Sequence, residues 1–320
     1  MRRILQAGTL AAGLAASAFA QQNAASLADV NAALQSGQAD KALALLSSLP
    51  VTAASHNLKC RVLYTLEQWD AAASECQLAV KMDGQNSVYH MWLARALGER
   101  ADRASFLSAY SLAKQVRAEF EQAVSLNPHN AAALADLGEF YYSAPSVVGG
   151  GDDKAAGIAT QLDKVDAARA HELRGHMAEQ KKDYPTAESE YKQSIAASAH
   201  PSSQWMTLAS FYRGRQNWAA LDAAIQSGMT AESRDHSAAV ALYDGAAVLS
   251  KANRNLALAA TMLEGYLADS SKTEDAPAFV AHTRLAQIKA QLGDKAGAGQ
   301  ERAAALALAH DYKPALNLKF

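Results

Sequence analysis

Residues 202–228 read SSQWMTLASFYRGRQNWAALDAAIQSG, and this stretch decides the fold. Bulky and small residues recur in each half at spacings of three and four, which is the period of one helix face. They are Trp205, Leu208, Ala209 and Tyr212 in the first half, and Leu221, Ile225 and Gly228 in the second. The polar run 215–217 between the halves has the composition of a turn. The stretch therefore predicts two antiparallel helices.

The same helix pair recurs along the chain. The second-helix pattern, with an apolar residue flanked by smaller ones, returns at Ala72, Cys76 and Ala79, at Val116, Phe120 and Ala123, and at Ala187, Tyr191 and Ser194. The first-helix pattern returns at Leu134, Leu137, Gly138 and Tyr141. A supersecondary unit repeated in this way is typical of a solenoid, because one unit alone cannot bury its apolar face.

This pattern resembles the tetratricopeptide repeat (TPR) family, whose unit is about 34 residues long with Leu-Gly and aromatic positions in its first helix. Alignment on those positions places repeat starts near 23, 53, 87, 131, 168, 202, 240 and 279. The segment 97–160 is similar to exported bacterial members of the family. The resemblance implies an all-α, right-handed α-solenoid of about eight helix-turn-helix repeats over residues 21–320. The weak terminal repeats are expected to act as caps that face water.

Two segments depart from the repeat length. About ten extra residues fall near 98–115 and predict a longer second helix or an inserted short one. Residues 143–153 read SAPSVVGGGDD, and their Pro and three consecutive Gly interrupt a helix. We expect an exposed loop there, between the two helices of one repeat.

The N-terminus has the layout of a secretory signal peptide. Residues 1–20 read MRRILQAGTLAAGLAASAFA, in which two Arg precede an uncharged apolar stretch and Ala-Phe-Ala offers a cleavage site. The apolar stretch is too short to span a bilayer. We expect cleavage near residue 20, a periplasmic or secreted mature chain, and no membrane span in that chain.

Two cysteines, Cys60 and Cys76, fall on the facing helices of one predicted repeat. In an exported protein, exactly two Cys favour a disulfide. The alternative is a pair of buried thiols that pack where Ala and an apolar residue usually lie.

The chain offers little that resembles a catalytic or metal site. It has 320 residues, 30 basic against 32 acidic, and is 50% hydrophobic, which excludes a disordered chain and argues against a nucleic-acid binder. His171 and His176 lie five residues apart, whereas a helical zinc motif needs four. Gly149–Gly151 lacks the Gly-Lys-Ser/Thr ending of a phosphate loop. We expect no catalytic residue, metal or cofactor.

In the TPR family the first helices line a concave groove, and the resemblance carries this role to matching positions here. Several of these positions hold Tyr, Met or Arg, which are favoured at interfaces. The alternative interpretation is that the same positions form an ordinary solvated helix face. The Lys-Asn clamp by which some members hold a terminal carboxylate is missing. The predicted groove residues are Asn57, Arg61, Tyr64, Met91, Arg95, Glu139, Tyr142, Glu172, His176, Met206 and Arg213.

The expected function is a non-catalytic protein-interaction scaffold or adaptor of the cell envelope, with an extended peptide or a helix in the groove. One alternative is a homo-oligomer that stacks through exposed terminal repeats, with residues 313–320 as a docking tail. A third is an enzyme with a site in the Gly-rich loop 143–153. The partner's identity does not follow from the sequence.

Overall fold

The computed structural model describes residues 26–235 and 239–320, and these residues form helices and loops without strands. The expected signal peptide lies outside them. In the described part of the chain, no helix combines the length and apolar character needed to cross a membrane. The α-helices are α1 Leu27–Gln35, α2 Ala39–Ser47, α3 Ala53–Thr65, α4 Trp69–Met82, α5 Ser87–Asp102, α6 Phe106–Leu126, α7 Ala131–Ser143, α8 Asp152–Leu162, α9 Ala167–Gln180, α10 Tyr184–Ala197, α11 Ser202–Gly214, α12 Trp218–Asp235, α13 Val240–Lys251, α14 Leu256–Ala268, α15 Ala278–Gln291, α16 Lys295–Leu308 and α17 Lys313–Leu316.

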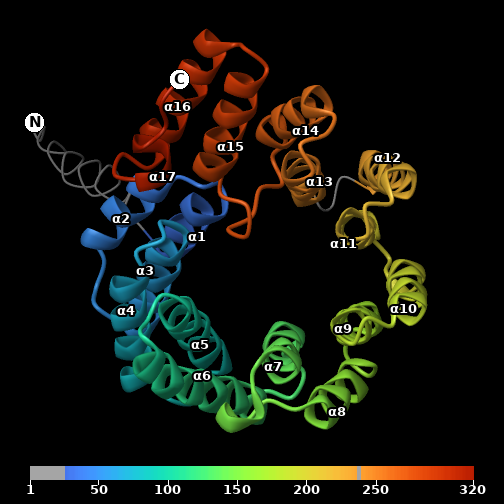
Figure 1. Ribbon diagram of the computed structural model, residues 1–320. Coiled ribbons are helices and arrows are strands. Elements are labelled where there is room, and N and C mark those ends of the chain that lie inside the picture. The colour runs from blue at the N-terminus through green and yellow to red at the C-terminus, as the bar shows by residue number, and fades with distance from the viewer. Residues whose placement is uncertain (1–25, 236–238) are drawn as a thin grey trace, which may run out of the picture.

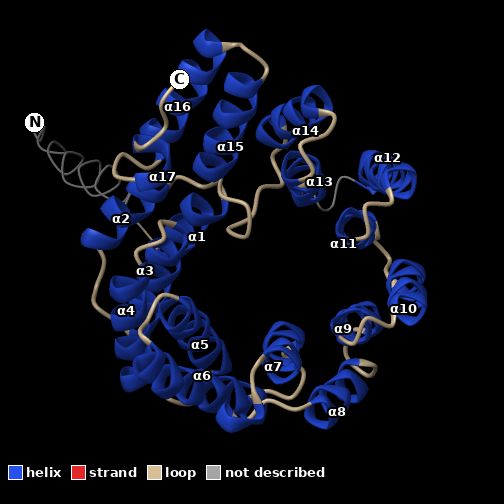
Figure 2. Ribbon diagram, viewed as in Figure 1, coloured by secondary structure: helices blue, strands red, loops and turns tan. Residues whose placement is uncertain are grey.

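Consecutive helices pack as pairs from α1–α2 to α15–α16, and the short α17 follows the last pair (Figure 2). The predicted all-α solenoid is thereby confirmed. Side-chain caps fix several first helices; Asn130, for example, accepts a hydrogen bond from the Ala133 amide at 3.1 Å. Within most pairs the turn holds one residue at positive φ, such as Glu67, Lys182 or Gln216. That left-handed residue ends the first helix and reverses the chain.

The two irregular segments have different structures. The extra residues near 98–115 lengthen both helices of one pair, so that α5 has 16 residues and α6 has 21. The segment 143–153 contains a 3₁₀ turn at Ser146–Val148. The expectation of a wholly exposed loop is wrong, because Val148 is buried and its carbonyl accepts a 3.4 Å hydrogen bond from Arg117 of α6.

The solenoid closes on itself (Figure 1). Helices α1–α3 meet α15–α17, and we call this contact the seam. Its core joins residues from both ends of the described chain, including Val30, Leu34, Phe279 and Tyr312, each at most 2% exposed. The expectation that the terminal repeats face water as caps is therefore wrong. Each terminal repeat covers the apolar face of the other.

Polar contacts reinforce the seam. Arg61 of α3 holds Glu274 through two hydrogen bonds of 2.9 and 2.5 Å. Glu274 also accepts one from Gln35, 239 residues away in sequence. Tyr312 donates a 3.0 Å hydrogen bond to Glu67. These groups link helices that are distant in sequence into one ring.

The C-terminal residues dock on their own chain. Ala315 of α17 is fully buried, and Arg302 donates hydrogen bonds to the carbonyls of Ala315 and Leu316, both at 2.9 Å. The alternative of stacking through exposed terminal repeats, with 313–320 as a free tail, does not fit this arrangement. Both surfaces are already in contact within one molecule.

Candidate functional site

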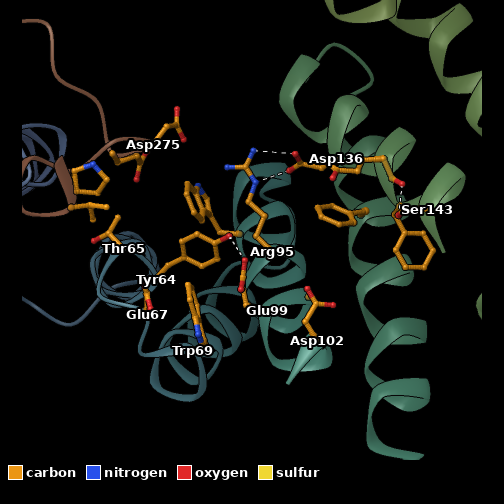
Figure 3. A pocket seen from close by; sticks show the side chains of 18 of the residues that line it. Tyr64, Thr65, Glu67, Trp69, Arg95, Glu99, Asp102, Asp136, Ser143 and Asp275 are labelled. Atoms are coloured by element: carbon orange, nitrogen blue, oxygen red, sulfur yellow. Dashed lines mark hydrogen bonds and ion pairs between the residues drawn. The ribbon is translucent and has the colours of Figure 1, made fainter. Parts of the chain in front are cut away.

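A cavity of about 550 Å³ lies inside the ring, and we call it the central cavity (Figure 3). It is bounded on one side by α3, α5 and α7, and on the other by α13 and the segment that leads into α15. The cavity thus exists because the solenoid closes. Its lining consists of Tyr64, Thr65, Glu67, Trp69, Trp92, Arg95, Gly98, Glu99, Asp102, Phe120, Asp136, Glu139, Phe140, Ser143, Tyr243, Glu274, Asp275, Pro277 and Val280.

Two smaller hollows continue the inner surface. One, of about 200 Å³ between α7 and α9, shares Asp136 and Glu139 with the central cavity. The other hollow, of about 390 Å³ among α9, α11 and α13, shares Glu172 with the 200 Å³ hollow. The three hollows therefore form one connected inner surface along the first helices of successive pairs. We call this surface the inner wall.

An aromatic cluster forms one end of the central cavity. The ring of Tyr64 meets Trp69 at 5.0 Å and Trp92 at 5.4 Å between centroids, both edge-on. The Tyr64 hydroxyl lies 3.4 Å from Glu99 and donates to it. Burial, followed by the charge of Glu99, raises the pKa of Tyr64, so the phenol stays protonated. The cluster packs α3, α4 and α5 against one another beneath the cavity.

Arginines lie over the two tryptophan rings of this cluster. The Arg95 guanidinium lies 4.7 Å from the Trp92 ring centre, and Arg103 lies 4.8 Å from that of Trp69. Arg95 is held by Asp136 of α7 at 2.6 and 3.2 Å, as Figure 3 shows. This two-point contact fixes the guanidinium in the middle of the cavity wall.

Carboxylates farther along the inner wall have raised pKa values. Burial raises the pKa of Asp244 to about 6; Arg284 opposes the shift and the negative charge of Asp275 adds to it. Enclosure by the cavity walls, followed by the charge of Asp136, raises the pKa of Glu139, although its carboxylate still reaches the solvent of the cavity. Both pKa shifts come first from burial, and a neighbouring carboxylate adds to each.

Most of the predicted groove residues lie on the inner wall. Tyr64, Arg95 and Glu139 line the central cavity. Tyr142, Glu172 and His176 line the second hollow, where the rings of Tyr142 and His176 stack at 6.2 Å. Arg61 faces the seam, where it holds Glu274.

The remaining predicted residues are less available. Asn57, Met91 and Met206 are 3, 6 and 2% exposed and pack between neighbouring helices, although Met206 still borders the 390 Å³ hollow. Arg213 is partly buried and lines none of the three inner hollows.

Several lining residues escaped the sequence reasoning. Trp69 and Asp136 lie outside the groove positions of the family pattern. Tyr243, Glu274 and Asp275 reach the cavity only through ring closure, for which the local sequence carries no signal. The two cysteines are joined as a disulfide between α3 and α4, with 5.3 Å between their Cα atoms.

The histidines of the near-miss zinc motif are engaged in other contacts. His171 Nδ1 lies 2.7 Å from Glu190 of α10. His176 Nδ1 lies 2.8 Å from the hydroxyl of Tyr191, which also donates to Glu179 at 2.8 Å. These contacts tie the two helices of one pair together.

Comparison with known proteins defines the fold class. No protein-family model matches the sequence, and no curated protein matches it. The structure is similar to a thermophilic TPR protein of Thermus thermophilus, TTC0263, with a TM-score of 0.50 and 16% identity over 58% of this chain and 98% of that one. A match to the Cut9–Hcn1 hetero-tetramer of APC/C has a TM-score of 0.42 and 12% identity, over 91% of this chain and 54% of that one. The chain thus has a TPR-like repeat fold, and the likeness extends to the fold alone.

Proposed function

We propose that this protein is a non-catalytic interaction scaffold that holds a polypeptide segment of a partner against its inner wall. The observation that carries the proposal is the continuity of the three hollows along the first helices. A chain of connected pockets suits a ligand that is long and narrow, such as an extended peptide or a helix. The TPR-like fold supports the same reading, because solenoids expose extended concave surfaces.

We further propose that the scaffold works in the cell envelope or outside the cell. The signal-peptide pattern of residues 1–20 supports export, and a disulfide between α3 and α4 is compatible with an oxidising compartment. Cell fractionation with N-terminal sequencing tests this directly. A periplasmic or extracellular chain that begins near residue 21 is expected, whereas a cytoplasmic chain that retains Met1 would overturn the proposal.

Site-specific photocrosslinking tests the scaffold function. A photoreactive amino acid replaces Thr65 or Ser143, which line the central cavity without an acidic or basic side chain. Matched control positions are Gln77 of α4 and Gln193 of α10, both exposed and outside all three hollows. Irradiation in whole cells is expected to join a partner to the cavity positions and not to the controls. A partner joined only at the control positions would place the interface elsewhere.

A further inference from the structure

Acidic residues dominate the inner wall. The three hollows are lined by three basic residues, Arg95, Arg169 and Lys251, and by nine acidic ones: Glu67, Glu99, Asp102, Asp136, Glu139, Glu172, Asp244, Glu274 and Asp275. The whole chain carries a formal charge of only −2. Negative charge is therefore concentrated inside the ring, and the rest of the chain has a positive excess.

Some of these acids are already compensated. Asp136 holds Arg95, Glu274 holds Arg61, and Glu99 holds Arg103. These contacts build the ring, because the first two link separate helix pairs and the third fixes the end of α5. Their charge is not available to a ligand.

Three acids of the central cavity have no such partner. The side chains of Asp102, Glu139 and Asp275 form neither an ion pair nor a side-chain hydrogen bond within the described residues, and all three are exposed to the cavity solvent. Figure 3 shows Asp102 and Asp275 on either side of Arg95. They come from α5, α7 and the segment before α15, so they surround the cavity from separate elements.

The cavity wall is chemically suited to guanidinium groups. The chain's own Arg61 and Arg95 lie over the Trp92 ring at 5.5 and 4.7 Å, and each is also held by a carboxylate. Aromatic faces and carboxylates together favour cations. The Trp92 ring already carries these two arginines, whereas the three unpaired carboxylates remain for a bound cation.

We propose that the central cavity selects a basic segment, one whose Arg or Lys side chains pair with Asp102, Glu139 and Asp275. The inference rests on the proposed scaffold function and adds the chemistry of the partner. It is the reverse of a clamp for a terminal carboxylate, since the free charges here are negative. Complementary charge of this kind sets which partner is accepted and accelerates association.

Peptide binding to the mature full-length chain tests the proposal. The probe is a fluorescein-labelled peptide with four Arg spaced by Gly and Ser, and its twin has Glu in place of each Arg. Fluorescence anisotropy is measured for the parent, for the triple variant Asp102→Asn, Glu139→Gln, Asp275→Asn, and for a control triple variant, Asp83→Asn, Asp153→Asn, Asp294→Asn. The control makes the same change in net charge at acids outside the inner hollows, of which Asp153 and Asp294 are exposed and Asp83 is partly exposed. Thermal unfolding checks that all three proteins fold alike.

The parent is expected to bind the Arg peptide and not the Glu peptide. The cavity variant is expected to weaken that binding about tenfold, from three exposed charge contacts, and the control to change it less than twofold. Raising the salt concentration should weaken the parent's binding. Equal losses in both triple variants, or equal binding of the two peptides, would overturn the proposal.

The crosslinking experiment separates this failure from failure of the scaffold function. A partner joined at Thr65 or Ser143, together with no preference for the Arg peptide, would remove the basic-segment proposal and leave the scaffold. Without a cavity crosslink and without peptide binding, both proposals fail.

Discussion

At the scale of single residues, a His–Glu pair recurs in four helix pairs. The distances from His Nδ1 to the Glu carboxylate are 2.6 Å for His56–Glu75, 2.5 Å for His90–Glu119, 2.7 Å for His171–Glu190 and 2.7 Å for His282–Glu301. Each His occupies the fourth position from a predicted repeat start, where Trp205 lies in the repeat at 202. These pairs join the first helix to the second, which accounts for His171 without a metal.

One of these pairs makes stability depend on pH. Burial disfavours the Glu301 carboxylate, but hydrogen bonds from Lys289 and His282 outweigh this effect and lower its pKa below the usual 4.5. The stabilisation that the ionised Glu301 gives the folded state is therefore present above about pH 4.5. It is lost as the pH falls through the lowered pKa of Glu301. Glu301→Gln should reduce the free energy of unfolding by about 1–2 kcal/mol at pH 7 and by much less at pH 3, measured by urea unfolding.

Glu264→Gln is the matched control. Glu264 contacts the same Lys289 at 3.1 Å, but its side chain is 52% exposed. A change within about 0.5 kcal/mol is expected. Equal losses in the two variants at both pH values would contradict the role given to Glu301.

Small residues at helix crossings are the second feature at this scale. A Cβ on Gly175 would lie 2.6 Å from the Tyr191 ring, whereas one on Gly157 meets no atom within 4 Å. Gly175→Ala should therefore destabilise the protein by about 1–3 kcal/mol. Gly157→Ala should be neutral or stabilise it by up to about 1 kcal/mol, because Ala favours the helix. Thermal unfolding of both variants checks this, and equal melting temperatures would show that the crossing at Gly175 tolerates a methyl group.

At the scale of helices, the sequence predicts where elements begin but not how closely they pack. The first helices begin within four residues of the predicted repeat starts, because caps, turns and apolar period are local signals. These local signals do not predict that the side chains of Met91 and Met206 are buried. A helix face gives the direction of a side chain, whereas its burial depends on how closely the next pair lies against it.

The disulfide between α3 and α4 gives a prediction for one helix pair. Its two cysteines are 16 residues apart, so the cross-link should contribute roughly 3 kcal/mol by restricting the unfolded chain. Reduction should lower the melting temperature of the parent and leave that of a Cys60→Ala, Cys76→Ala variant unchanged. Thiol titration of the denatured protein should find no thiol before reduction and two after it. Two thiols in the unreduced protein would exclude the bridge.

At the scale of the whole molecule, ring closure was not predictable from the repeat pattern. Gln35 and Glu274 are hydrogen-bonded across 239 residues, and nothing near either one in sequence indicates the other. The outcome depends on how much each pair turns relative to the next. That small angle accumulates over all the pairs and is set by packing details that helix periodicity does not contain. The opposite side of the central cavity was missed for the same reason.

Gly37 gives a test of closure. It has φ +69°, and a Cβ there would overlap the backbone nitrogen of Ala278 across the seam. Gly37→Ala should therefore force α1–α2 away from α15 and increase the radius of gyration in solution scattering. Gly293→Ala is the matched control, since Gly293 has φ +87° but no atom within 4 Å of the added Cβ. The control introduces backbone strain without a clash across the seam. An equal increase in the radius of gyration of both variants would therefore show that the expansion does not come from opening of the seam.

The seam also changes how the molecule opens locally. A linear array of repeats frays from its ends, because each outermost repeat has one neighbour instead of two. Here the first and last helix pairs pack against each other, so neither of them has only one neighbour. Amide hydrogens in α1 and α16 should then exchange with solvent as slowly as those in α7 and α9, and only a cooperative opening of the ring should release them. In Gly37→Ala the terminal helices should exchange first, with the middle of the array still protected.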